Sequence, residues 1–174
     1  MACGGEHVVY RYGADEVIKF SLFDLLVWKG ESRRKAEHDL VLSEAVFGPY
    51  VLPTRLATSP DGKRLAKIQR YANGRPLRRS DMRDASLRRQ FEDLMRRRRA
   101  LVDEHGADID LLGGLGFLTG SFSNVFVEDG ALCIIDALLV AKENPSVVPA
   151  LARAARFLLR SRQDALARAF LSAF

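Results

Sequence analysis

Asp136 is the residue of this sequence whose surroundings most need a chemical explanation. It stands in the apolar segment 131–140, which runs ALCIIDALLV. Burying a carboxylate without a partner is costly, so we expect Asp136 to have a partner, to bind a metal ion or to face solvent. Asn124 precedes it across a short hairpin that turns at Glu128-Asp129-Gly130. This spacing of an amide and a carboxylate around one hairpin is the most specific chemical pattern in the chain.

Four further polar residues lie in segments where they could face a ligand. Lys19 stands in the strand-like stretch VIKF, and Glu37 stands in the charged segment that follows. Gln69 and Tyr71 belong to the stretch IQRYAN. Lys19, Glu37 and Asn124 also have simpler explanations, because strand lysines and helix glutamates usually face solvent and an asparagine before a strand often belongs to a turn.

The first part of the chain is expected to form two hairpins and one helix. Runs of β-branched and aromatic residues flank Gly13-Ala14-Asp15, and a second pair of runs flanks Ser59-Pro60-Asp61-Gly62. Between the hairpins, Ser32 is a suitable N-cap and Gly48-Pro49 ends the helical pattern. The predicted strands span 7–12, 16–23, 50–58 and 64–71, and the predicted helix spans 32–47.

The break Asn73-Gly74-Arg75-Pro76 predicts a boundary between a domain at 1–75 and a domain at 76–174. Beyond it, apolar residues at helical spacing predict a long helix over 85–104. The run Arg96–Arg99 lies in this helix, and we expect a solvated face rather than a nucleic-acid patch, because consecutive residues spread around a helix. The remaining predicted elements are a buried connection at 111–120, a hairpin at 124–140 and two helices within 145–174, the second restarting at Ser161 and Asp164.

The composition is that of an ordinary folded chain. The 174 residues are 48% hydrophobic and 28% charged, which allows one sizeable core or two small lobes. The net charge of +5 permits binding to phosphates, nucleic acid or acidic proteins without requiring any of them. Cys3 and Cys133 lack the spacing of a zinc site or a disulfide framework. No apolar signal core or membrane-length run is present, so we expect a cytoplasmic protein without a membrane partner.

The predicted order is hairpin, helix, hairpin, linker, long helix, buried loop, hairpin and helices. This order resembles the protein-kinase-like superfamily, especially its minimal bacterial members. Lys19, Glu37, Asn124 and Asp136 carry the resemblance. It implies a two-lobed, reduced protein-kinase-like fold of the α+β class. A small antiparallel sheet with one helix would form the N-terminal lobe, and a mainly helical part with a β-hairpin would form the C-terminal lobe.

The resemblance also implies a role for each residue. Lys19 looks like the strand lysine that holds the α and β phosphates of ATP, and Glu37 looks like the helix glutamate that pairs with it. Asn124 and Asp136 resemble the pair that binds Mg²⁺, a hard cation that prefers oxygen ligands. ATP and magnesium are therefore the expected cofactors. The segment against which adenine would stack includes Gln69 and Tyr71.

Three parts of the family pattern are not matched. The catalytic aspartate of the family precedes the asparagine by five positions, and Thr119 stands there, although a hydroxyl is a poor base at neutral pH. Asp108 and Asp110 lie upstream and would need a different loop path to reach the site. Gly4-Gly5 lacks the GxGxxG spacing, so the family's first strand and phosphate lid are expected to be absent, and no activation segment follows Asp136.

Three functions remain open on these residues. The first is a phosphotransferase that moves the γ-phosphate of ATP, and the second is a pseudokinase-type module that docks a partner protein without catalysis. The third is a basic nucleic-acid-binding domain. It is the least favoured, because aromatic residues make up only 9% of the chain and none interrupts Arg96–Arg99.

Overall fold

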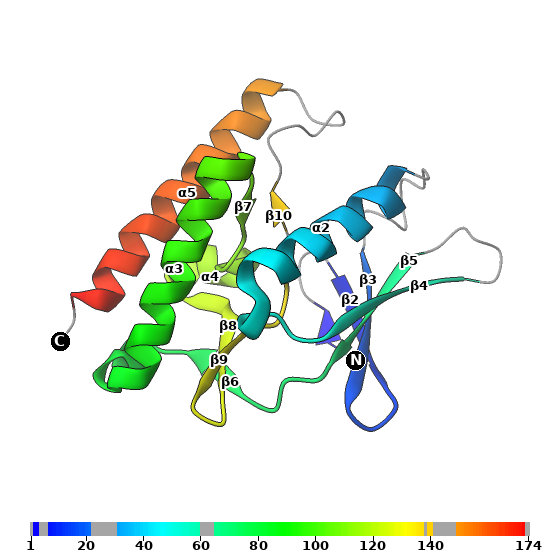
Figure 1. The fold of residues 1–174 in the computed structure, drawn as a ribbon, viewed down its shortest axis with the longest axis horizontal. Helices are drawn as coiled ribbons and strands as arrows, with labels where there is room; N and C mark the ends of the chain where they lie inside the picture. Colours follow the sequence, from blue (N-terminus) through cyan, green and yellow to red (C-terminus); the bar gives the residue numbers. More distant parts are fainter. Residues whose placement is uncertain are drawn as a thin grey trace.

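A computed structural model describes residues 2–3, 7–21, 31–59, 65–137, 139–140 and 149–172. The chain combines helices with small antiparallel sheets, which confirms the predicted α+β class. One sheet and its helix lie on one side of the molecule, and two long helices with the shorter strands lie on the other (Figure 1). Within the described residues, no helix is both long and apolar enough to cross a membrane.

The larger sheet has five strands, and every neighbouring pair is antiparallel. Both predicted hairpins are confirmed, although the tip of the second, residues 60–64, lies outside the described residues. A two-residue strand precedes the first hairpin, because Ala2 and Cys3 pair with Val9 and Val8. In spatial order the strands are β1 (Ala2–Cys3), β2 (His7–Tyr12), β3 (Glu16–Ser21), β5 (Leu65–Arg70) and β4 (Thr54–Thr58).

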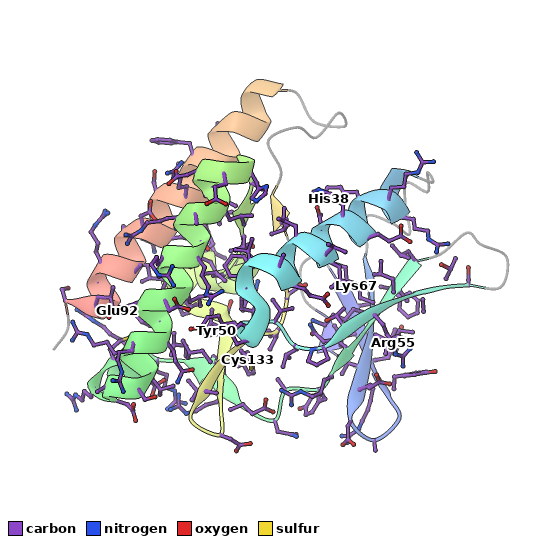
Figure 2. All side chains as sticks on the ribbon, viewed as in Figure 1. His38, Tyr50, Arg55, Lys67, Glu92 and Cys133 are labelled. Atoms are coloured by element: carbon purple, nitrogen blue, oxygen red, sulfur yellow. The ribbon has the colours of Figure 1, made fainter. Side chains whose placement is uncertain are left out.

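Strand alternation places a polar row on one face of this sheet. In the β3–β5 register, Lys19 lies opposite Lys67 and Val17 lies opposite Gln69. Residues two apart on a strand share a face, so these four side chains point the same way. The helix α2 (Glu31–Phe47) covers this face, and Figure 2 shows Lys67 beneath it. The sheet therefore presents two lysines and a glutamine to the helix.

The second part of the chain is built around α3 (Ala85–His105). The Asp84 side chain accepts hydrogen bonds from the amides of Ser86 and Leu87, which caps the helix start. Gly106, with φ of 64°, ends the helix in the left-handed conformation that glycine adopts readily. The elements around α3 are η1 (Gly48–Tyr50), β6 (Arg75–Leu77), η2 (Arg79–Arg83), β7 (Asp108–Ile109), α4 (Gly113–Thr119), β8 (Phe122–Glu128), β9 (Ala131–Ile134), β10 (Leu139–Val140) and α5 (Pro149–Leu171).

Three predictions about this part are corrected by the structure. The connection at 111–120 contains the short helix α4. The strand expected to continue to residue 140 ends at Ile134, and β10 pairs with β7 instead of extending the hairpin. One helix, α5, runs through the expected break, because Asp164 bonds to a residue of α3 instead of restarting a helix. Residues 145–148 of the predicted helical region lie outside the described residues.

The hydrophobic core fills the space between α3, α5 and the β6-β8-β9 sheet. Phe91, Phe122 and Phe170 meet there, with ring centroids 5.1 to 5.8 Å apart. Gln163 of α5 is fully buried; it accepts a hydrogen bond from the Leu111 amide and donates one to the Ile109 carbonyl. This side chain supplies backbone partners for the segment that leads into α4.

The four consecutive arginines of α3 have different surroundings. Arg96 and Arg97 pair with Asp93, so the pKa of Asp93 falls to about 2, chiefly through the hydrogen bond from Arg97. Arg98 is 1% exposed and pairs with Asp108 of β7 and Asp164 of α5, both at 2.6 Å. Arg99 is exposed. The expectation of a solvated face is therefore wrong for Arg98. Its buried ion pairs join α3, β7 and α5.

The five-stranded sheet is tied to the β8–β9 hairpin by one ion pair. Both terminal nitrogens of Arg70 donate to the Glu128 carboxylate, and the Asn73 amide donates to it at 2.8 Å. A Cβ atom on Gly74 would lie 2.3 Å from the Val127 carbonyl oxygen, so the chain passes directly against β8 here. The polypeptide thus leaves the larger sheet after Arg70 along a fixed path.

Replacing Arg98 with alanine should destabilise the protein severely. The substitution would leave Asp108 buried and without its main partner, and breaking such a buried pair typically costs about 3–5 kcal/mol. The free energy of unfolding, measured by urea denaturation, should fall by an amount of this order. Arg89→Ala on the exposed side of the same helix is the control, with an expected change within about 0.5 kcal/mol. Equal losses in both variants would contradict a stabilising role for the buried pair.

Candidate functional site

A narrow cleft lies between the polar face of the large sheet, α2 and residues 136–137. Its free volume is about 20 Å³, the room that a single water molecule or ion needs. Counting its open mouth, the hollow measures about 430 Å³. The cleft is lined by Lys19, Ala36, Asp39, Leu40, Val51, Thr54, Leu56, Lys67, Gln69, Asp136 and Ala137. It contains charged side chains from both the sheet and the segment after β9.

Lys19 is the most deeply buried charge of the cleft, at 8% exposure. Its Nζ atom donates to the Ile135 carbonyl, directly beside Asp136 in the chain. Burial lowers the pKa of Lys19, the negative charge of Asp136 opposes this shift, and the positive charge of Lys67 adds to it. The structure therefore brings Lys19 and Asp136 together in one cleft. It also adds Lys67, which strand alternation with Gln69 could have revealed from the sequence.

The acidic residue that α2 turns toward the cleft is Asp39. Glu37 is exposed and pairs with Arg33 at 2.8 Å, so its expected pairing with Lys19 is not formed. Asp39 lines the cleft on the same helical face as Ala36 and pairs with Lys35 one turn earlier. Helical spacing from Ala36 was the signal that could have identified Asp39, since positions three apart share a face.

The two residues expected near an adenine ring are separated. Gln69 is 5% exposed, lines the cleft and donates to Thr54 Oγ1 at 3.0 Å. Tyr71 is 44% exposed and lies outside the cleft lining. The Arg11 guanidinium lies 5.7 Å from the centre of the Tyr71 ring. The structure thus brings Gln69 into the site and leaves Tyr71 on the surface.

Asn124 joins the segments around the site through three hydrogen bonds. Its side-chain Nδ2 donates to the Asp110 carbonyl at 2.9 Å, and its backbone amide donates to the Leu111 carbonyl at 3.2 Å. Its own carbonyl accepts from the Ile135 amide at 3.0 Å. The Asn124 Oδ1 atom lies 2.8 Å from where a Cβ on Gly113 would stand, and Gly113 has φ of 62°. A glycine at 113 therefore leaves the amide oxygen uncovered.

Asp110 is the acidic residue that the five-position spacing missed. Its Oδ1 atom accepts from the amides of Leu112 and Gly113, each at 2.9 Å. Burial raises the pKa of Asp110, those two amide hydrogen bonds lower it, and the negative charge of Asp136 raises it further. The carboxylates of Asp110 and Asp136 thus lie close enough to repel, with Asn124 bonded to the Asp110 backbone.

Thr119 stands away from this group of acids. It is the last residue of α4, is exposed, and its hydroxyl bonds to Ser121 Oγ at 2.8 Å. The short helix α4 lies in the chain between Asp110 and Asn124. The residue five positions before Asn124 is therefore the last residue of α4. Thr119 therefore lies on the exposed end of α4, whereas Asp110 precedes α4 in the chain and interacts with Asp136.

The arrangement fits a magnesium ion only together with a bound phosphate. Within the described part of the chain, no group of three or more His, Cys, Asp or Glu side chains could hold a metal. Asn124 offers one amide oxygen, and Asp136 offers a carboxylate. Magnesium is typically held by one or two carboxylates and by phosphate oxygens of the substrate, so a small oxygen set of this kind suits it.

No protein-family model matches the chain, and no curated protein matches it either. The assignment of chemistry to this site therefore rests on the side chains and their geometry.

Replacing Asp110 with asparagine should raise stability at neutral pH. Asparagine keeps an oxygen for the Leu112 and Gly113 amides but removes a charge that burial and Asp136 disfavour. Because the folded-state pKa is raised above the unfolded value of about 4, the wild-type penalty is absent below pH ~4 and grows as the pH rises through the folded-state pKa. The Tm of Asp110→Asn should therefore equal that of the wild type at acidic pH and exceed it increasingly as the pH rises toward neutrality.

Thermal melting of both proteins between acidic and neutral pH measures this difference. Asp103→Asn, on the exposed side of α3, is the matched control and should show no comparable gain. A loss of stability in Asp110→Asn at neutral pH would contradict the assigned surroundings of this carboxylate.

Proposed function

We propose that this protein is kinase-like and binds a nucleoside triphosphate with magnesium in the cleft beneath α2. The observation that carries the proposal is that Lys19 and Asp136 both line this cleft, with the Asp110 carboxylate close enough to Asp136 to repel it. Asn124 bonds to the Asp110 carbonyl behind them. Phosphoryl transfer uses groups of these kinds: a lysine that holds phosphates, an amide and a carboxylate that hold the metal, and a second carboxylate that acts as the base. The two-lobed, reduced protein-kinase-like fold belongs to the same proposal.

Each residue has a defined part in the proposed reaction. Lys19 would hold phosphate oxygens, with Lys67 beside it on the neighbouring strand. Asn124 and Asp136 would hold Mg²⁺, which neutralises charge on the transferring phosphate. Asp110 would accept the proton of the attacking hydroxyl. Its raised pKa moves it toward the range in which a carboxylate is an effective general base.

A second candidate is a pseudokinase-type module that works by docking a partner protein. The closed cleft favours it, because a free volume of about 20 Å³ is far below the 300–1,000 Å³ (roughly) of small-molecule sites. Lys19 is also bonded to the Ile135 carbonyl, so a phosphate would have to displace that bond. Nucleotide binding under the first candidate thus requires α2 and the sheet to move apart.

Mg-ATP should stabilise the wild-type protein against heat, and Asp136→Asn should abolish the effect. Ligand at about 100 times its dissociation constant stabilises by about 2.7 kcal/mol. Asp129→Asn makes the same chemical change in the turn of the same hairpin, where φ of 50° suits asparagine, and should keep the full shift. Thermal melting with ATP, with and without magnesium, measures this. A wild-type Tm that Mg-ATP leaves unchanged would refute nucleotide binding.

Phosphate transfer separates the two candidates once binding is established. Removing a general base typically lowers kcat by about 10²–10⁴-fold, so Asp110→Asn should lose transfer from radiolabelled ATP and keep the Mg-ATP shift. Thr119→Val should leave both unchanged, because Thr119 is at the exposed end of α4. Nucleotide binding without transfer by the wild type, to protein substrates or to itself, would favour the docking module.

A further inference from the structure

A second hollow lies between α3 and α5, which run side by side (Figure 1). Its free volume is about 220 Å³, and it shares no lining residue with the cleft beneath α2. Pockets for drug-sized molecules span roughly 300–1,000 Å³, so this one suits a smaller ligand. It is lined by Arg98, Arg99, Val102, Arg160, Asp164, Ala167, Arg168 and Leu171.

The charge of this hollow is strongly positive. Four arginines face one aspartate, a formal balance of +3 (4 − 1) among the lining residues. Asp164 is already bonded to Arg98 Nη1, and the other side of the Arg98 guanidinium is held by Asp108. The one acidic group of the hollow is therefore engaged by the arginine of its inner wall.

Three of the arginines form no ion pair with any acidic residue in the described part of the chain. Among the residues that the structure describes, Arg99, Arg160 and Arg168 form no ion pair and are exposed. Arg160, Asp164 and Arg168 follow one another at intervals of four on α5, so they share one helical face. Arg99 approaches the same space from α3. Guanidinium groups from two helices thus converge on one recess.

We propose that this recess binds a small anion carrying two or more linked phosphate groups. Planar guanidinium groups donate paired hydrogen bonds to phosphate oxygens, and a compact polyphosphate could engage Arg99, Arg160 and Arg168 together. The apolar parts of Val102, Ala167 and Leu171 exclude water from part of the wall, which strengthens those charge interactions. The site is independent of the cleft beneath α2 and of any activity there.

Tripolyphosphate is a suitable probe, with orthophosphate at matched ionic strength as its comparison. Calorimetric titration in the presence of EDTA should show tighter binding of tripolyphosphate to the wild-type protein. Each arginine contact to an anion is worth about a tenfold change in affinity, so Arg99→Gln with Arg168→Gln should weaken binding about 100-fold. Arg89→Gln removes an exposed arginine elsewhere on α3 and should leave the affinity unchanged.

Lys19→Met tests whether the probe binds in the other cleft instead. Loss of binding in Lys19→Met with retention in the arginine double variant would overturn the proposal. So would equal weakening by Arg89→Gln, which would indicate a general charge effect, or binding of tripolyphosphate no tighter than orthophosphate. Circular dichroism of the double variant checks that its fold is retained, which the exposure of both side chains leads us to expect.

Linked phosphate groups could belong to a lipid headgroup or to a free phosphorylated compound. Vesicles that contain a phosphatidylinositol bisphosphate distinguish these two sources. Vesicle binding that tripolyphosphate displaces and that the double variant loses would assign the recess to a lipid headgroup. Tripolyphosphate binding without vesicle binding would assign it to a free phosphorylated compound. Capture of an acidic peptide without any binding of tripolyphosphate would overturn the proposal.

Discussion

The hydrogen bonds of Asn124 are the constraint on which the candidate site depends. One residue bonds to the backbone of Asp110 and Leu111 on one side and to the Ile135 amide on the other. The Ile135 carbonyl in turn accepts from Lys19, so the large sheet is joined to the same set of bonds. The segments around residues 110, 124 and 135 and the large sheet are thus joined by one set of hydrogen bonds. Because Asp110 belongs to this set and Asp136 follows Ile135 in the chain, these bonds also fix the positions of both acids.

The protein places several charges where burial disfavours them. Burial lowers the pKa of Lys19 and raises that of Asp110, whereas Arg98 is stabilised by two carboxylates. The Arg98 pairs join α3, β7 and α5, with one guanidinium bonded to two carboxylates. Burial shifts the pKa of Lys19 and of Asp110 toward the neutral form, and shifted pKa values of this kind are concentrated at functional sites in many proteins. This difference separates the structural ion pair from the candidate site.

Several features were predictable because they depend on local patterns. Gly13 and the turn at residues 128–130 indicated hairpins that the structure contains, and the spacing of Leu87, Phe91 and Leu94 predicted α3. Lys19, Gln69 and Asp136 all line the cleft, although they come from distant parts of the chain. The short helix α4 was not predictable, because its sequence GGLGFLT is rich in glycine and shows no helical periodicity. The sequence therefore did not reveal that the path through α4 leaves Asp110 beside Asp136.

The sequence alone determined the hairpins, the two helices α2 and α3, and the presence of an acid after β9, because turn chemistry and side-chain periodicity act over a few residues. The tertiary structure decided which acids face one another. It turned Asp39 toward the cleft and left Glu37 in solvent. It gave Arg96 and Arg97 one shared partner, Asp93, and buried Arg98 against two other carboxylates. It also carried α5 through Asp164 as one helix. These outcomes depend on contacts between distant segments, whose free energies outweigh the local preferences that a sequence pattern reports.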